Sequence, residues 1–411
     1  MPYLAWLDPH VLCDLFAENY TIEDATSYLQ LTYPEKKGIS IRNVQRFMND
    51  HSIKLQQGLS TQELEQEVRS ATTEMGGTAG RKMMKSWLQL NGVNASSERI
   101  RLAQAVVAPA YHANRRRQTD RQVNPQSYRA PYFGYNLHVD QNEKLAEFGI
   151  VFVMAADGRS ALITRGAVMP RKNNITIYDL VYAASVHEYG LWDQLIADHG
   201  REFFLAEHIQ YQLKDLRVKP DGTISGRPAY RQLTSVQNNR IERLWSEVNK
   251  RVGYPLKYAL HEMVDNHLID KMDGSHLFAC SIIGSSVANV LLQRFIDTWN
   301  NHVIPKNRKP SDYIRARENY RIPPNALPST EDAVLMYQNG IYGGSLTEET
   351  QFGENLLQGR PFEEQERDQR FWIELEASGG VTMLANTVIN HSYQSFQDAI
   401  LRFIQITNSL L

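Results

Sequence analysis

The sequence predicts an α/β core, a mixed sheet flanked by helices, preceded by helical units and followed by a mostly helical C-terminal region. Up to about residue 110, apolar residues recur at helical spacing. A nearly continuous apolar run at 148–156 and a second strand at 161–168 then flank the turn Asp157-Gly158, which indicates a hairpin in a largely buried sheet. Helical spacing at 175–189 precedes a short buried run at 195–197, and such alternation is typical of an α/β layer.

Composition narrows the possible classes of protein. The 411 residues are 42% hydrophobic and 22% charged, as in ordinary soluble proteins of several domains. The two cysteines, Cys13 and Cys280, are too few for a disulfide framework or a Cys-rich zinc site and fit a reducing compartment. Asp8 interrupts the apolar start and serines interrupt the run 277–292, so we expect no signal peptide and no membrane span.

Charge is distributed unevenly around a net charge of −2. Residues 1–135 hold 16 Lys and Arg against 13 Asp and Glu, whereas residues 325–411 hold 4 against 12. Together with the turns, this predicts six segments: a helix-turn-helix at 1–56, a second, winged-helix-like one at 57–110, a basic linker at 111–132, an α/β core at 133–256, a helical extension at 257–325 and an acidic region at 326–411.

The first helical unit has one strongly polar helix face. Thr21 and Asp24 resemble a capping box, and Ser40 can cap a further helix. The outward positions of that helix include long hydrogen-bond donors suited to phosphates and base edges: Arg42, Asn43 and Arg46. A helical bundle with a merely solvated polar face remains the alternative.

The second unit repeats this pattern. Helices are expected from about Thr61, through Met83 to Leu88, and after a cap near Ser96, with Arg99 and Arg101 on the outer face. In the following linker, a basic run could track a phosphate backbone or simply be solvated: Arg115, Arg116 and Arg117.

Three acids fall where the predicted core would bring them together. Asp140 is expected to end the short strand 137–139, and Asp198 to end the strand 195–197. Glu242 lies at the margin of the buried stripe of a predicted helix. Clustered carboxylates resist ionisation, and a divalent cation with oxygen ligands relieves this. The pattern therefore favours two Mg²⁺ or Mn²⁺ ions and in-line phosphodiester chemistry.

The residues around these acids carry a resemblance to a known family. Residues 137–145 and 198–202 resemble the first- and second-aspartate motifs of eukaryotic integrase-core-domain proteins, within the retroviral-integrase and DDE-transposase superfamily. Residues 156–160 resemble that family's hairpin turn, and 238–245 its glutamate helix. The likeness extends over roughly 60–315, with departures from the usual residues at Leu137, Gln141, Phe203 and Gln237.

The resemblance implies an RNase H-like core and a DDE-type integrase or transposase that cleaves and joins DNA in the nucleus. Asp140, Asp198 and Glu242 would be its catalytic residues and metal ligands. Because such enzymes act on paired DNA ends, a homo-oligomer is expected. Two rivals remain: a domesticated DNA-binding protein without catalysis, and an RNase H-like nuclease acting on RNA–DNA hybrids.

Several neighbouring residues have open roles. Arg240 and Arg243 could contact phosphates or pair with the acids. His138 is expected to be a packed structural histidine, on the ground that strand neighbours face opposite sides. The loop 214–232 is expected to contact substrate or to be mobile, and the acidic C-terminal region to bind the core, another subunit or a partner protein.

Overall fold

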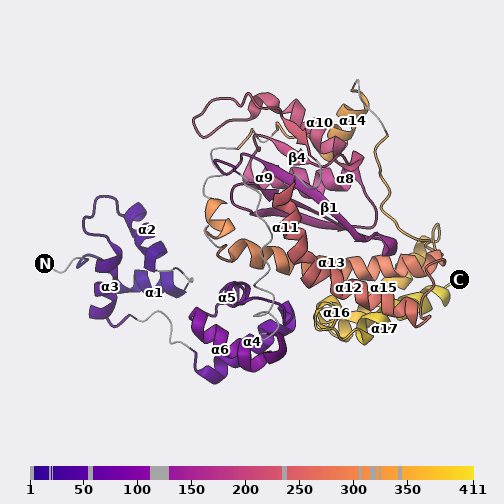
Figure 1. The fold of residues 1–411 in the computed structure, drawn as a ribbon, viewed down its shortest axis with the longest axis horizontal. Helices are drawn as coiled ribbons and strands as arrows, with labels where there is room; N and C mark the ends of the chain where they lie inside the picture. The colour runs from indigo at the N-terminus through magenta and orange to yellow at the C-terminus, as the bar shows by residue number, and fades with distance from the viewer. Residues whose placement is uncertain are drawn as a thin grey trace.

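The computed structural model describes residues 4–17, 20, 22–53, 59–111, 129–233, 238–304, 308–314, 321–323, 325–340 and 345–411. At its centre lies a five-stranded sheet in the order β3-β2-β1-β4-β5 (Figure 1). The strands are β1 (Leu137–Leu145), β2 (Ile150–Asp157), β3 (Ile163–Met169), β4 (Leu195–Ala197) and β5 (Tyr230–Gln232). β1 pairs antiparallel with β2, and β2 with β3, whereas β1, β4 and β5 are parallel. The predicted mixed α/β core is confirmed.

Alternation along β2 creates two apolar layers. Ile150, Phe152 and Met154 belong to the same core as the helices α11 (Asn239–Val248), α12 (Tyr254–Asp265) and α13 (Gly274–Asn301). Val151 and Val153 face the other layer, which contains α10 (Phe204–Gln212) and one continuous helix made of α8 (Asn174–Thr176), a π-helical segment (Ile177–Ala183) and α9 (Ala184–Tyr189). Burial on both faces explains why the sequence of β2 is continuously apolar.

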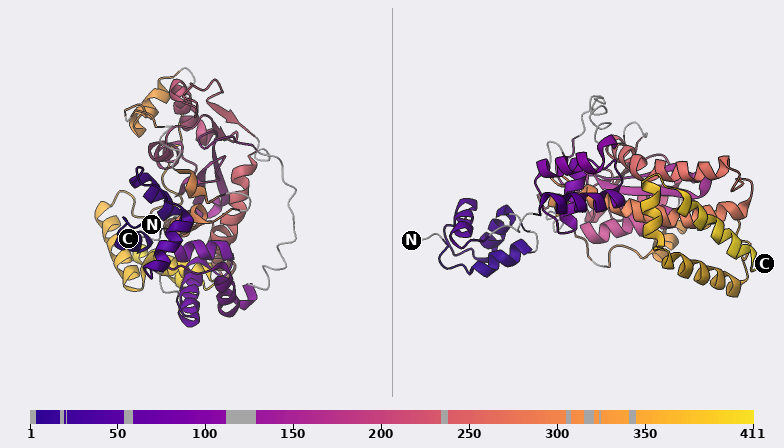
Figure 2. Two further views of the ribbon diagram at one scale, coloured as in Figure 1. Left: turned by 90° about the vertical axis from the view of Figure 1, so that its left-hand side faces the viewer. Right: turned by 90° about the horizontal axis from the view of Figure 1, so that it is seen from below.

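The first three helices have a small core of their own. They are α1 (Pro9–Ala17), α2 (Ile22–Thr32) and α3 (Ile41–Asp50), and they stand apart from the rest of the molecule in Figure 1 and in the right-hand view of Figure 2. The hydroxyl of Ser40 accepts a hydrogen bond from the backbone of Asn43, so the predicted cap is confirmed. Thr21 lies outside the described residues.

The next three helices share a core with the end of the chain. They are α4 (Thr61–Met75), α5 (Arg81–Leu90) and α6 (Ser97–Val107), the last capped by Ser96 as predicted. α5 packs against α13, and α4 packs against α16 (Gly380–Ile389). Arg294 links α13 to both α4 and α16, because its guanidinium donates to the backbone oxygen of Glu74 in α4 and to Oδ1 of Asn386 in α16.

The acidic C-terminal region therefore binds the core, one of the three roles expected for it. α14 (Thr330–Gln338) packs on α10. α15 (Pro361–Ala377), α16 and α17 (Gln394–Asn408) pack on one another and, through α16 and α17, against α12 and α13 (Figure 1). The region acts as a further layer over the helices that cover the sheet.

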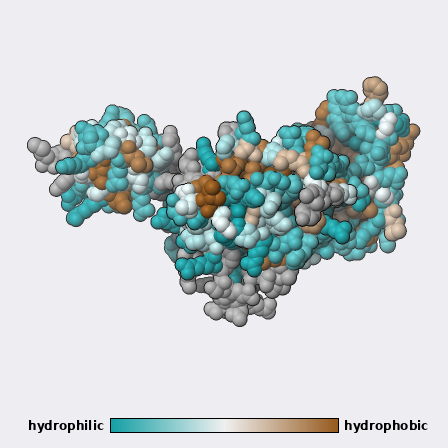
Figure 3. All heavy atoms as spheres, turned by 90° about the horizontal axis from the view of Figure 1, so that it is seen from above, coloured by the Kyte–Doolittle hydropathy of each residue, from teal (hydrophilic) through white to brown (hydrophobic). Residues whose placement is uncertain are grey.

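Helix α13 is long and apolar enough to cross a membrane by length and hydropathy alone. More than half of its most apolar window, 56%, is buried inside the protein, as expected for a central core helix. On the face drawn in Figure 3, apolar residues form scattered patches between hydrophilic ones rather than a continuous belt.

Residues 345–357 form a strap that joins α14 to α15 across the sheet. The side chain of Asn173 donates to the backbone oxygen of Glu349 at 3.0 Å, and the amide of Glu354 donates to the oxygen of Gly274 at 2.7 Å. Gly353 has a positive φ of 77° where the strap crosses the start of α13. A Cβ there would lie 2.4 Å from the oxygen of Gly274 and from the amide nitrogen of Phe278.

We therefore expect Gly353→Ala to lower the free energy of unfolding by about 2–3 kcal/mol, because strain and backbone overlap add together. Gly359→Ala is the matched control. Its φ is also positive, at 83°, yet nothing lies within 4 Å of the added methyl group, so about 1 kcal/mol is expected. Urea unfolding measures both, and equal losses would contradict the proposed crossing.

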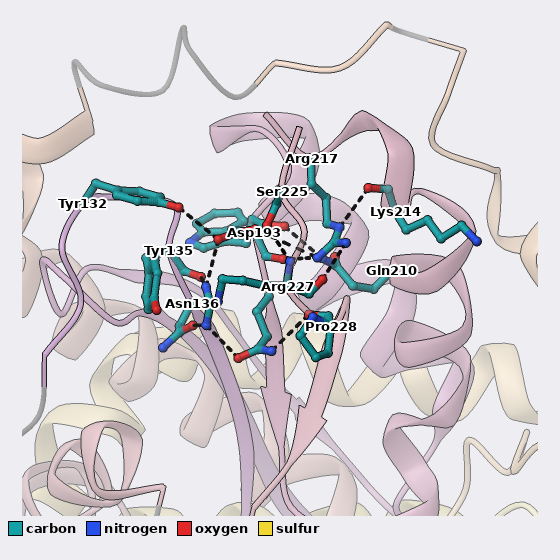
Figure 4. A network of polar contacts seen from close by, with 12 residues as sticks. Tyr132, Tyr135, Asn136, Asp193, Gln210, Lys214, Arg217, Ser225, Arg227 and Pro228 are labelled. Atoms are coloured by element: carbon teal, nitrogen blue, oxygen red, sulfur yellow. Dashed lines mark hydrogen bonds and ion pairs between the residues drawn. The ribbon is translucent and has the colours of Figure 1, made fainter. Parts of the chain in front are cut away.

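The loop 214–232 is not free to contact substrate along its whole length, because two arginines fix it to the sheet (Figure 4). Arg227 donates to Oδ2 of Asp193 at 2.9 Å and stacks on the ring of Tyr135, with 3.6 Å between the guanidinium carbon and the ring centroid. Arg217 donates to the backbone oxygen of Asp193 at 2.6 Å. The loop also ends in β5, which the sequence analysis did not predict.

Arg227→Ala is expected to lower the free energy of unfolding by about 3 kcal/mol, because the Asp193 side chain is only 2% exposed and would lose its closest charged partner. Arg231→Ala, an exposed arginine on β5, is the control and should cost less than about 0.5 kcal/mol. Denaturant unfolding measures the free energy of unfolding of both variants. Equally small losses would show that Arg227 does not fix the loop to the sheet.

Candidate active site

The register of β1 and β4 places two of the predicted acids side by side. His138 pairs with Ile196 in the parallel ladder, and Asp140 and Asp198 each follow two residues later. Neighbouring parallel strands lie about 4.8 Å apart, so the two aspartates leave adjacent strands at the same level. Asp198 follows β4 directly, as predicted, whereas Asp140 lies within β1 rather than at its end, which corrects the expected position.

Helix α11, which carries Glu242, is attached to β1 by a polar ladder, defined here as three hydrogen bonds from alternate positions of the strand. His138 Nδ1 donates to Oδ1 of Asn238 at 2.6 Å, just before the helix begins. Trp245 Nε1 donates to Oδ2 of Asp140 at 3.1 Å in the middle. The side chain of Asn142 donates to Oδ1 of the Asn249 side chain at 2.8 Å, where α11 continues into the π-helical segment Asn249–Gly253.

The ladder corrects the reasoning about His138. Positions two apart on a strand share a face, so His138 and Asp140 point the same way rather than to opposite sides. The histidine is nevertheless fully buried, and burial lowers its pKa to about 4. His138 is thus a neutral structural residue that orients the start of α11.

The three acids influence one another electrostatically. The pKa of Asp140 is raised to about 7, chiefly by burial and also by the negative charges of Glu242 and Asp198, which together outweigh the lowering effect of hydrogen bonds from Gln141 and Trp245. The pKa of Glu242 is also raised, first by burial and then by the negative charge of Asp198, whereas the positive charge of Lys144 lowers it. Such mutual repulsion is what a shared cation would relieve.

The donor set fits a hard divalent cation, since every candidate ligand is a carboxylate oxygen. Within the parts of the chain that the structure describes, however, no three His, Cys, Asp or Glu side chains lie close enough together to hold a metal ion. Asp140 is fixed by its bonds to Trp245 and to the amide of Gln141, and Asp198 accepts from the amide of Gly200. Glu242 is half-buried and accepts no side-chain hydrogen bond from any described residue.

The comparison with protein families decides the identity of this region. A family model described as an integrase core domain matches residues 128–316, which include the whole sheet, the three acids and helices α8 to α13. This region of the chain is an integrase core domain. The mixed sheet and flanking helices are the RNase H-like fold of the retroviral-integrase and DDE superfamily. No curated protein matches the chain.

Beside the acids of the integrase core lies a charged network that the sequence analysis missed. Lys172 reaches Glu143 at 2.7 Å and the buried Glu202 at 3.5 Å, and Gln141 donates to both of these carboxylates. No spacing rule links Lys172, which follows β3, to residues of β1. Glu202 lies within residues 198–202, which resemble the second-aspartate motif, and this resemblance was the one sequence feature that pointed to the network.

A fourth acid, Glu207 of α10, lies on the β5 side of Asp198. Its side chain is buried, and its pKa is raised to about 7 by burial and by the charge of Asp198. Gln232 of β5 donates to both of its oxygens, at 3.1 and 3.2 Å. Because β5 was not predicted, no sequence pattern placed Glu207 near the site.

The predicted DNA-binding residues fall into different surroundings. Arg42 and Arg46 are exposed on α3, while the side chain of Asn43 donates to the backbone oxygen of Gly38. Arg99 donates to the backbone oxygen of Leu59, and Arg101 forms an ion pair with Glu98. The remaining predicted residues are Arg240, which donates to Gly158, Arg243, which is exposed, and Arg115, Arg116 and Arg117, which lie outside the described residues.

Glu242→Gln should stabilise the metal-free protein at about pH 8 and raise its Tm by about 1–3 °C. Folding raises the pKa of Glu242 above its unfolded value of 4.5, so the folded protein is destabilised as the pH rises from 4.5 through the folded pKa. The stabilisation by Glu242→Gln should therefore vanish near pH 4. Magnesium should then raise the Tm of the parent chain but not that of the variant.

Glu366→Gln, on the exposed side of α15, is the control and should show neither effect. Thermal unfolding across pH, with and without magnesium, is the measurement. A variant that is less stable than the parent at every pH would argue against repulsion among the three acids.

Proposed function

We propose that the chain is a metal-dependent polynucleotidyl transferase of the DDE type, which cleaves DNA strands and joins them to new partners. The carrying observation is the placement of Asp140 and Asp198 at equivalent positions of paired parallel strands, with Glu242 on the helix attached to the same strand. Integrase core domains generally belong to this class of enzyme.

The residues have distinct parts in this chemistry. Two bound Mg²⁺ or Mn²⁺ ions would supply activation of the attacking oxygen and stabilisation of the leaving oxygen. Asp140 and Asp198 would hold them, and Glu242 would complete the set. Trp245 and the amide of Gln141 keep the oxygens of Asp140 oriented, and the bonds of His138 and Asn142 hold α11 at a fixed distance from β1.

Recognition of DNA is assigned to the helical units before the core. Arg42 and Arg46, exposed on α3, would contact phosphates or base edges in the manner of a helix-turn-helix. Arg99 and Arg101 of α6 are already bonded within the chain, which supports a smaller contribution from them. Action on paired DNA ends would require a homo-oligomer, and we place that activity in the nucleus.

A second candidate is a domesticated DNA-binding protein that keeps the fold without turnover. It is favoured by one observation: among the described residues, no three potential ligands lie close enough together to hold an ion. In that case, the helical units would still bind DNA, and the core would serve as a scaffold.

A strand-cleavage and strand-transfer assay with Mn²⁺ separates these functions. Asp198→Asn should reduce product formation at least about 100-fold relative to the parent chain, because it removes a ligand without changing size. Asp265→Asn, on the exposed side of α12, is the control and should retain full activity. Equal products from parent and Asp198→Asn would reject the catalytic proposal, and preferential cleavage of RNA–DNA hybrids over duplex DNA would indicate a nuclease of the RNase H type instead.

A further inference from the structure

An open groove of about 530 Å³ begins at Glu242 and runs between the end of β1 and the helices α11 and α12. Most of the residues that line it carry polar side chains, among them Lys144, Lys250 and Tyr254. The hydrogen-bonded side chains of Asn142 and Asn249, both buried, also line it. The groove is therefore built on the same polar ladder that positions Glu242.

A bulge in β1 aims one of the lysines. Asn142 pairs with Phe152 and Leu145 with Ile150, so the register shifts across Glu143 and Lys144. The side chain of Asn142 accepts a hydrogen bond from the amide of Lys144 at 3.1 Å, which fixes the bulged backbone. Bulges of this kind redirect side chains beside functional sites.

Lys144 and Tyr254 form a paired donor. The ammonium of Lys144 donates to the hydroxyl oxygen of Tyr254 at 3.1 Å and lies 5.2 Å from the centre of its ring. Since that oxygen accepts from the lysine, the hydroxyl proton is left to donate elsewhere. One ammonium and one hydroxyl then present donors together, which suits an oxyanion such as a phosphodiester.

The acids around the groove are mostly neutralised by neighbours, which leaves its lysines to act on an anion. Glu143 pairs with Lys172 at 2.7 Å, and Glu247 pairs with Arg251 at 2.5 Å. Lys250 is 3.8 Å from Glu247, a weaker contact, and its side chain is 54% exposed. Beyond Glu242 itself, the charge offered to a ligand is therefore positive.

We propose that this groove binds the DNA strand flanking the cleaved phosphodiester, with Lys144 and Tyr254 contacting one phosphate and Lys250 a neighbouring one. The assignment rests on the proposed function, since it takes the acid site as the place of cleavage. The contacts are to the backbone, so they hold the strand in position without reading its sequence.

The test measures binding of a short DNA duplex at several salt concentrations by the full chain carrying Asp198→Asn. Each of Lys144→Ala and Lys250→Ala should reduce the slope of log affinity against log salt by about 0.7–0.9. Tyr254→Phe, which keeps the ring and loses only the hydroxyl, should weaken binding by about threefold to tenfold. Lys214→Ala is the matched control, because the ammonium of Lys214 lies 4.8 Å from the ring centre of Tyr211 in a similar pair just beyond the end of α10.

The outcomes separate the two proposals. If the parent chain cleaves DNA but the groove variants keep the parent slope, the groove assignment is overturned and the catalytic function stands. If no cleavage occurs but only the groove variants lose slope, DNA binding in the groove is supported and catalysis is rejected. Binding of an RNA strand more than about tenfold tighter than DNA of the same sequence would overturn the choice of DNA.

Discussion

The polar ladder between β1 and α11 is the constraint on which the site depends. A helix packed on a sheet by apolar contacts alone can slide or rotate slightly at little cost, whereas three directional hydrogen bonds from one strand fix its position along and around its axis. Because two of these bonds lie at the ends of α11 and one at its middle, the carboxylate of Glu242 is confined to the reach of its own side chain.

Much of the core could be predicted because local rules sufficed. The continuous apolar run of β2, the short strand before Asp198 and the helix carrying Glu242 each have a pattern readable in one window of sequence. The three acids were then found by their neighbours in the chain and by family resemblance. For two of them the pairing of distant segments agrees with this order, because parallel pairing of β1 with β4 brings residues 140 and 198 to the same level.

What escaped prediction depends on contacts far apart in the sequence. β5 is only three residues long and has no apolar alternation, and the loop that precedes it is held at Asp193 by Arg217 and Arg227, which are distant from Asp193 in the sequence. Tyr254 pairs with Lys144 across 110 positions, and Lys172 reaches acids on two other elements. The error over His138 was of another kind, since strand geometry was applied to residues two positions apart as though they were adjacent.

The shared packing of α4 to α6 with α13 and α16 has a mechanical consequence. Helices α4 to α6, which are expected to bind DNA, share a hydrophobic core with the helices that cover the sheet. A tilt of α4 to α6 would therefore also displace the part of the protein that carries the acids. Orientation of a target by these helices would therefore set its angle of approach to the acids. Helix α16 packs against both α4 and α13, so the loss of the C-terminal helices would loosen the orientation of α4 to α6 relative to the acids.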